Sequence, residues 1–224
     1  MPLLFLLCTA ASCLLPAPGE VVPDFTNCLE FFLDRMPPDA SLVPPGAVRI
    51  CQFYKNAYRF ATMYDKEKRI PVYSAYTCKQ GKGPRLDDRT PGKSMEDEWD
   101  TNLAAADIEK NQATVEDYRH FSKLNQEVWA NFKNQIKKEA HVCKDLYVIT
   151  GAVPGEEYIS DGRVASHIWS AACCVREKHR RTSWAAIAKN DENKVKEQSL
   201  EKLTKVLAEL YGKGKVDLFN NACK

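Results

Sequence analysis

The sequence predicts an α+β domain in which helices pack on a mainly antiparallel sheet. Two observations lead to this prediction. Short segments with alternating apolar residues, rich in β-branched and aromatic side chains, follow one another between turns, which is typical of antiparallel strands. Two further segments, 122–143 and 199–211, repeat apolar residues at the spacing of amphipathic helices. We find no internal repeat.

The first 19 residues differ from the rest of the chain. They carry no charge and contain a Leu-rich run, with Ala17 and Gly19 at the −3 and −1 positions of a cleavage site before Glu20. Pro16 and Pro18 break the run, which is short for a membrane span. We therefore expect a signal peptide at 1–19, a single domain at 20–224, and a secreted protein.

In the first half of the chain the pattern indicates a short helical turn and a loop, followed by strands that include a hairpin. The charged residues 65–68 form the expected turn of that hairpin. Residues 79–116 are polar, long for a loop, and contain a possible short helix at 99–110. The expected elements are the loop 24–45 and strands 48–52, 57–64 and 69–78.

In the second half, strands are expected after the long helix. Residues 145–153 read as a buried strand that Pro154-Gly155 stops. The second helix, 199–211, places Gly212 at its C′ position, where glycine ends helices. Further strands are expected at 164–175 and 183–188, with a last edge strand at 215–219.

The helix 122–143 contains one residue that does not fit its apolar face. Leu124, Val128, Phe132 and Ile136 recur every fourth residue, and Asn125 projects into the same stripe. A buried amide without a partner costs about 1–3 kcal/mol. Asn125 therefore needs either a neighbouring backbone carbonyl or a metal ion with its waters.

Cysteine usage indicates an oxidising compartment. Seven cysteines remain after position 19, which reads as a disulfide framework with one thiol left over, paired between chains, or deprived of its partner. No CxxC motif or paired histidine spacing supports a zinc site. The seven are Cys28, Cys51, Cys78, Cys143, Cys173, Cys174 and Cys223.

The net charge of +2 predicts no strong field for nucleic acid. The densest basic run is REKHRR at 176–181, directly after Cys173-Cys174. It can be read either as a solvated loop or as a phosphate-binding segment.

Four segments in order carry a resemblance to a known family. They are RFATMYDKEKRIPVYSAYTC, KLNQEVW, CKDLYVITGAVPG and SHIWSAACC. Together they resemble the DNA/RNA non-specific endonucleases, in particular the endonuclease domain-containing 1-like group, over roughly residues 24–223. The resemblance implies a ββα-metal nuclease fold that cuts DNA and RNA.

In that family one divalent cation, usually Mg²⁺, is held by a hairpin and a helix, and a histidine in an Asp-Arg-Gly-His-type motif is the general base. The residues around Asn125 match the family's metal-binding asparagine, so the resemblance implies that Asn125 is a metal ligand. The metal would neutralise the scissile phosphate and the leaving oxyanion.

The chain departs from the family's pattern in two ways. Lys133 stands where the family places a glutamate, and the Asp-Arg-Gly-His-type motif is absent. Only four residues lie between Arg119 and Leu124, too few for the two strands and the turn of the family's hairpin. His120 is a weak candidate for the base because it adjoins the helix that carries Asn125. His167, in an alternating strand, reads as structural.

Three functional hypotheses follow. The first is a secreted, metal-dependent nuclease whose activity is impaired in this chain. The second is a non-catalytic, disulfide-stabilised secreted binding protein on the same scaffold. The third is that the chain does not fold stably, because its helix lacks the hairpin on which it packs.

Overall fold

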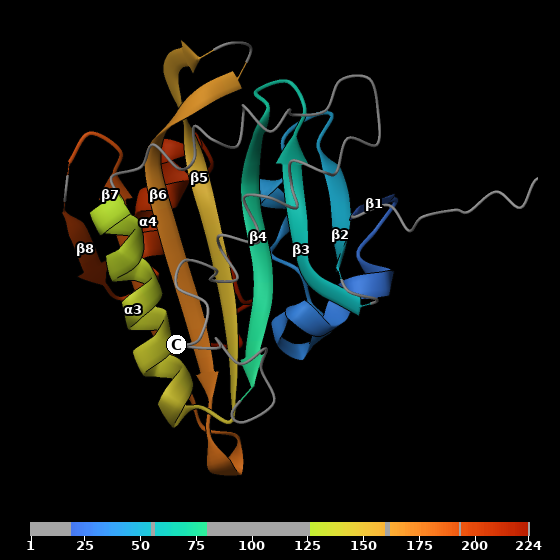
Figure 1. Ribbon diagram of the computed structural model, residues 1–224, viewed down its shortest axis with the longest axis vertical. Helices are drawn as coiled ribbons and strands as arrows, with labels where there is room; N and C mark the ends of the chain where they lie inside the picture. The colour runs from blue at the N-terminus through green and yellow to red at the C-terminus, as the bar shows by residue number, and fades with distance from the viewer. Residues whose placement is uncertain (1–18, 55–56, 80–125, 160–161, 193, 224) are drawn as a thin grey trace, which may run out of the picture.

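The computed structural model describes residues 19–54, 57–79, 126–159, 162–192 and 194–223. Within them one eight-stranded sheet runs in chain order, and every neighbouring pair of strands is antiparallel (Figure 1). The strands are β1 (Gly19–Val22), β2 (Val48–Tyr54), β3 (Ala57–Asp65), β4 (Ile70–Lys79), β5 (Asp145–Ile159), β6 (Gly162–Val175), β7 (Arg181–Lys189) and β8 (Val195–Gln198).

Helices lie on both faces of this sheet. In Figure 1, α3 (Gln126–Val142) lies in front of the half formed by β5 to β8, and α4 (Leu200–Leu210) lies behind it. The predicted antiparallel sheet is thus confirmed, and helices are few in the part of the chain that the structure describes. The described residues also contain short 3₁₀ helices: η1 (Thr26–Phe31), η2 (Leu33–Arg35), η3 (Ala40–Leu42) and η4 (Glu177–His179).

The larger core lies on the α4 side of the sheet. Leu203 and Leu207 of α4 and Phe32 of the N-terminal turns pack there against Trp169 of β6, all fully buried. Ser199 caps α4, its side chain accepting from the Lys202 N–H at 3.2 Å, and Gly212 follows the helix with φ +63°. Both ends of the predicted helix 199–211 are therefore confirmed to within one residue.

Three disulfides join distant parts of the chain: Cys28–Cys51, Cys143–Cys174 and Cys173–Cys223. They tie η1 to β2, the end of α3 to β6, and the C-terminal segment to β6. The predicted disulfide framework is confirmed. Cys78, near the end of β4, takes no part in these bridges.

Two strand predictions were wrong. Strand β5 does not stop at Pro154-Gly155 but continues to Ile159, with register shifts at Pro154, where a residue without an N–H is accommodated by a bulge. Residues 215–219 are not a strand. The Asp217 carboxylate accepts the backbone N–H groups of Phe219 and Asn221, at 3.2 and 3.1 Å, and so holds a turn there. The sheet edges are β1 and β8 instead.

The long predicted helix is observed from Gln126 onward, as α3. Residues 1–18 of the expected signal peptide, the possible helix at 99–110, and residues 122–125 lie outside the described residues. None of the helices that the structure describes is long and apolar enough to span a bilayer.

Candidate functional site

Helix α3 directly follows Asn125, the metal ligand that the family resemblance implies. Two buried side chains pack this helix against the sheet. Phe132 is 1% exposed and meets Trp184 of β7 edge to face, with ring centroids 6.3 Å apart. Ile136, one turn further on, packs with Leu146 and Val148 of β5. The apolar residues at every fourth position, which predicted the stripe, thus place α3 against the half of the sheet formed by β5 to β8.

The C-terminal end of α3 is fixed covalently. Cys143 follows the last helical residue and is bonded to Cys174 on β6, and both cysteines are buried. Packing at Phe132 and Ile136, together with the bond at Cys143, therefore holds the described part of α3 against the strands beneath it.

A row of hydroxyl groups crosses the same face of the sheet. Thr62 of β3 bonds Ser74 of β4 with 2.7 Å between the oxygens, and Thr150 of β5 bonds Ser170 of β6 at 2.9 Å. Ser74 and Thr150 are register partners, so the four residues stand side by side on four strands. Each hydroxyl is buried and hydrogen-bonded, so this row is a structural feature of the sheet and not a nucleophile.

Gln52 of β2 is a second buried polar residue. It is 1% exposed, and neither atom of its amide has a hydrogen-bond partner. Its neighbour two residues back, Ile50, packs in the cluster that also contains Ile136, so Gln52 extends from the face that carries α3. No sequence pattern singled out Gln52 or the hydroxyl row, because isolated polar residues inside strands carry no periodic signal.

Of the histidines that the structure describes, His167 lies on the opposite face of the sheet. His167 lies beside Trp169 on the face that packs with α4, its Nδ1 is 3.1 Å from the Ser166 hydroxyl, and burial and then the nearby Lys189 charge lower its pKa. His141 and His179 are exposed, in the last turn of α3 and in η4. The structural role predicted for His167 agrees with its place on the opposite face from α3.

The two predicted site residues cannot be placed. Asn125, the predicted metal ligand, and His120, the weak candidate base, both lie outside the described residues. Asn125 is, however, the residue directly before the first turn of α3. Across the described ranges no three His, Cys, Asp or Glu side chains gather as metal ligands. The fit of the chain to Mg²⁺ therefore depends on Asn125 and on nearby residues outside the described ranges.

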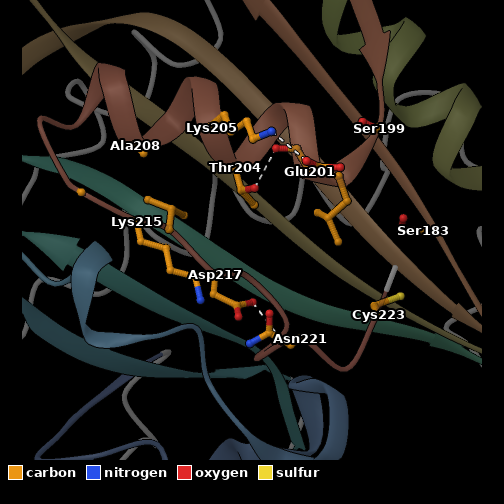
Figure 2. A pocket seen from close by; sticks show the side chains of 13 residues that line it. Ser183, Ser199, Glu201, Thr204, Lys205, Ala208, Lys215, Asp217, Asn221 and Cys223 are labelled. Carbon is orange, nitrogen blue, oxygen red and sulfur yellow. Dashed lines mark hydrogen bonds and ion pairs between the residues drawn. The ribbon is translucent and has the colours of Figure 1, made fainter.

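A cavity of about 660 Å³ lies on the other side of the molecule, between α4 and the C-terminal segment (Figure 2). Three of its charged side chains have partners: Lys205 pairs with Glu201 at 2.7 Å, and Asp217 binds backbone N–H groups. Sequence reasoning did not predict this cavity, because its residues come from two segments with no shared motif. Nothing in its lining relates it to α3.

Comparison with known proteins shows that the chain shares a family relationship with the non-specific nucleases. The particular relatives are the endonuclease domain-containing 1 proteins of mouse and human. The mouse protein is 30% identical over 199 positions, covering 67% of this chain and 39% of the relative, and the human protein is 28% identical over 204 positions, covering 70% and 40%. No family model matches the chain.

The chain thus spans about 40% of the length of these relatives. The alignment with the mouse protein has 199 positions but covers only 67% of the 224 residues of this chain. The mouse protein therefore carries positions inside the matched region that have no counterpart here.

Among solved structures, the chain is similar to one from a crystal structure of the EndoG/EndoGI complex. The TM-score is 0.46 with 13% identity, over 75% of this chain and 85% of that one.

Proposed function

We propose that this chain is a secreted protein on a nuclease scaffold that binds DNA or RNA, and that its hydrolysis of phosphodiesters is impaired. The family relationship supports the scaffold and the substrate class. Three disulfides support an oxidising compartment and hence secretion.

The observation that carries the impairment is the short connection before α3. Only His120 to Lys123 separate Arg119 from Leu124, and the alignment with the mouse relative contains positions that this chain lacks. The resemblance places the base-bearing hairpin in that connection. A general base contributes roughly 10²–10⁴-fold to the rate, so its loss leaves at most a trace of cleavage.

The metal half of the site is retained in this proposal. By resemblance Asn125 would hold Mg²⁺, which when bound neutralises charge on the phosphate. Lys133, in place of the family's glutamate, removes an assisting carboxylate from the second turn of α3. The ion could then still help the chain to bind a phosphodiester without supplying the base that activates water.

A plasmid-nicking assay tests the proposal. Purified chain is incubated with supercoiled plasmid in Mg²⁺ and in EDTA, beside the Asn125→Ala variant. We expect nicking in Mg²⁺ to be at or just above the buffer control. Rapid nicking that EDTA abolishes and Asn125→Ala removes would mean that the chain is a working nuclease, and the impairment would be wrong.

The second hypothesis, a fully non-catalytic binding protein, differs in one readout. A trace of EDTA-sensitive nicking that depends on Asn125 favours an impaired enzyme, whereas nucleic-acid binding with no such trace favours the binding protein. Absence of nucleic-acid binding in any buffer would exclude both.

A further inference from the structure

Three cationic residues stand side by side where β5, β6 and β7 end. The backbone N–H of Lys144 donates to the Val175 carbonyl at 2.9 Å, and the N–H of Arg176 donates to the Arg180 carbonyl at 2.8 Å. The last register partners, Asp145 with Val175 and Val175 with Arg181, are the next residues along. Arg176 and Arg180 therefore continue the β6–β7 ladder by one position, and Lys144, in a bend before β5, bonds to the residue before Arg176. The three residues are here called the basic row.

Strand alternation puts the extended residues Arg176 and Arg180 on the face that carries α3, and Lys144 directly follows Cys143, which packs in that face's cluster. Leu146 and Cys174, two residues inward from Lys144 and Arg176, both pack in a cluster with Ile136 of α3. Asp145 falls on the opposite face, where Arg181 is bound by Asp34 at 2.7 Å. The carboxylates of that face do not neutralise the basic row.

The charges of the basic row are uncompensated within the described part of the chain. None of the ion pairs found there involves Lys144, Arg176 or Arg180, and the buried Nε of Arg176 has no hydrogen-bond partner. Residues opposite each other on adjacent strands are about 5 Å apart, where like charges repel. Glu139 on α3 and Glu177 in η4 are the acidic residues closest in sequence on this side.

The helix end beside the basic row offsets only part of this repulsion. Figure 1 shows that α3 runs down to the same end of the sheet as the β6–β7 connection. A helix C-terminus carries about half a negative charge, against three positive charges in the row. The Cys143–Cys174 disulfide adjoins both Lys144 and Arg176 in sequence and holds the strand ends in place. The row is a preorganised cationic site with exposed Lys144 and Arg180.

We propose that the basic row binds backbone phosphates of a nucleic acid, at a contact separate from the N-terminal end of α3. This inference rests on the proposed function and adds a second contact to it. The 17 residues of α3 span about 25 Å at 1.5 Å per residue. At about 3.4 Å per step, a duplex of roughly eight base pairs covers that length. One nucleic acid can therefore touch both ends of the helix, and the relationship to endonuclease domain-containing proteins favours it as the occupant over a sulfated glycan.

The test measures binding without hydrolysis. Fluorescence anisotropy of a labelled 24-base-pair DNA duplex is recorded in EDTA at several salt concentrations. The variant Lys144→Glu/Arg180→Glu is compared with Lys202→Glu/Lys213→Glu, which changes the net charge equally at exposed positions near α4. If the first variant does not fold, Lys144→Gln/Arg180→Gln replaces it. Heparin is used as a competitor and as a separate probe.

We expect the basic-row variant to raise the Kd about tenfold or more and to lower the salt slope by about two, because two phosphate contacts are lost. The control variant should change the Kd less than twofold. If both variants weaken DNA binding equally, or neither weakens it, the basic row is not the contact, although the proposed nucleic-acid binding still holds. Heparin binding that depends on the row, with DNA binding unchanged, also overturns this contact. Failure of the wild-type chain to bind DNA at low salt rejects the proposed function as well.

Discussion

Gly151 of β5 has no room for a side chain. A Cβ there would come within 2.3 Å of both the Trp169 ring and the Val72 carbonyl oxygen. The carbonyl belongs to the neighbouring strand and cannot move without breaking the ladder. The space that a Cβ at Gly151 would need is thus filled by the indole of the buried Trp169. The indole N–H donates to the Tyr211 hydroxyl at 3.1 Å.

The substitution Gly151→Ala is therefore expected to destabilise the fold. Overpacking of this kind costs typically about 1–3 kcal/mol. Urea unfolding followed by tryptophan fluorescence measures the loss. Gly214→Ala is the matched control, since nothing lies within 4 Å of a Cβ at that position. Equal stability of the two variants would contradict the close approach of Trp169 to the strand.

Two tyrosines are expected to make the free energy of unfolding fall as the pH rises above 10. Burial raises the pKa values of Tyr73 and Tyr211 above the ordinary value near 10. Below pH 10 both the folded and the unfolded chain hold these protons, so the contribution to stability is fully present. Above it the unfolded chain ionises first, and stability falls as pH rises towards the folded pKa.

Each such tyrosine should lower the free energy of unfolding by about 1.4 kcal/mol per pH unit above pH 10. The Tyr73→Phe variant is expected to show a slope smaller by one tyrosine. Urea midpoints measured from pH 8 to pH 11 for the wild type and the variant give the two slopes. Parallel curves would mean that Tyr73 ionises as easily in the folded protein as in the unfolded one.

At the level of elements, α3 depends on one covalent bond and two apolar side chains. The Cys143–Cys174 bridge closes a separation of 31 residues, and Phe132 and Ile136 fill the space above the sheet. One hypothesis from the sequence was that the chain folds poorly because this helix lacks the hairpin on which it packs. In the described residues, α3 instead packs on β5, β6 and β7.

Removing that bridge tests how the helix is held. The double variant Cys143→Ala/Cys174→Ala is expected to lose about 3–4 kcal/mol of stability. Hydrogen exchange followed by mass spectrometry should show faster exchange in α3 and no change in α4, which lies on the other face. Uniform acceleration across the chain would contradict a local role for the bridge.

Elements with strong periodic patterns were predictable from the sequence. The stripe of Phe132 and Ile136 predicted a helix. β-Branched and aromatic runs predicted strands β2 to β4, β6 and β7 to within a few residues, and the start of β5. The edge strands β1 and β8 were missed because short edge strands with one neighbour have little alternation. The prediction for residues 215–219 was misled because Val216 and Leu218 alternate with charged residues as in a strand, whereas they are buried beside a turn held by Asp217.

The candidate site was only partly predictable. The motif around Asn125 identified the helix by family resemblance, but neither Asn125 nor His120 is among the described residues. The basic row could not be found by spacing, because Lys144 is 32 positions before Arg176 and only the antiparallel register brings them together. In the run at 176–181, residues 177–180 are exposed, and Arg181 is bound to Asp34.

At the scale of the whole molecule, the sheet separates two regions of different use. The α4 face carries the larger core and two of the three disulfides, Cys28–Cys51 and Cys173–Cys223, whose cysteines belong to that core. The α3 face carries the smaller clusters, the hydroxyl row, Gln52 and the basic row. The account therefore assigns stability mainly to one face and nucleic-acid contact to the other, along the length of α3.

The central claim is that the chain keeps the scaffold and lacks the base. The most direct measurement is single-turnover nicking of supercoiled plasmid, with protein in excess over DNA and Mg²⁺ present. The chain is compared with a version in which a hairpin carrying an Asp-Arg-Gly-His-type motif is inserted between Arg119 and Phe121. We predict little or no nicking by the chain and a rate higher by roughly 10²–10⁴-fold in the version with the insertion. Equal and rapid EDTA-sensitive nicking by both proteins would contradict the claim.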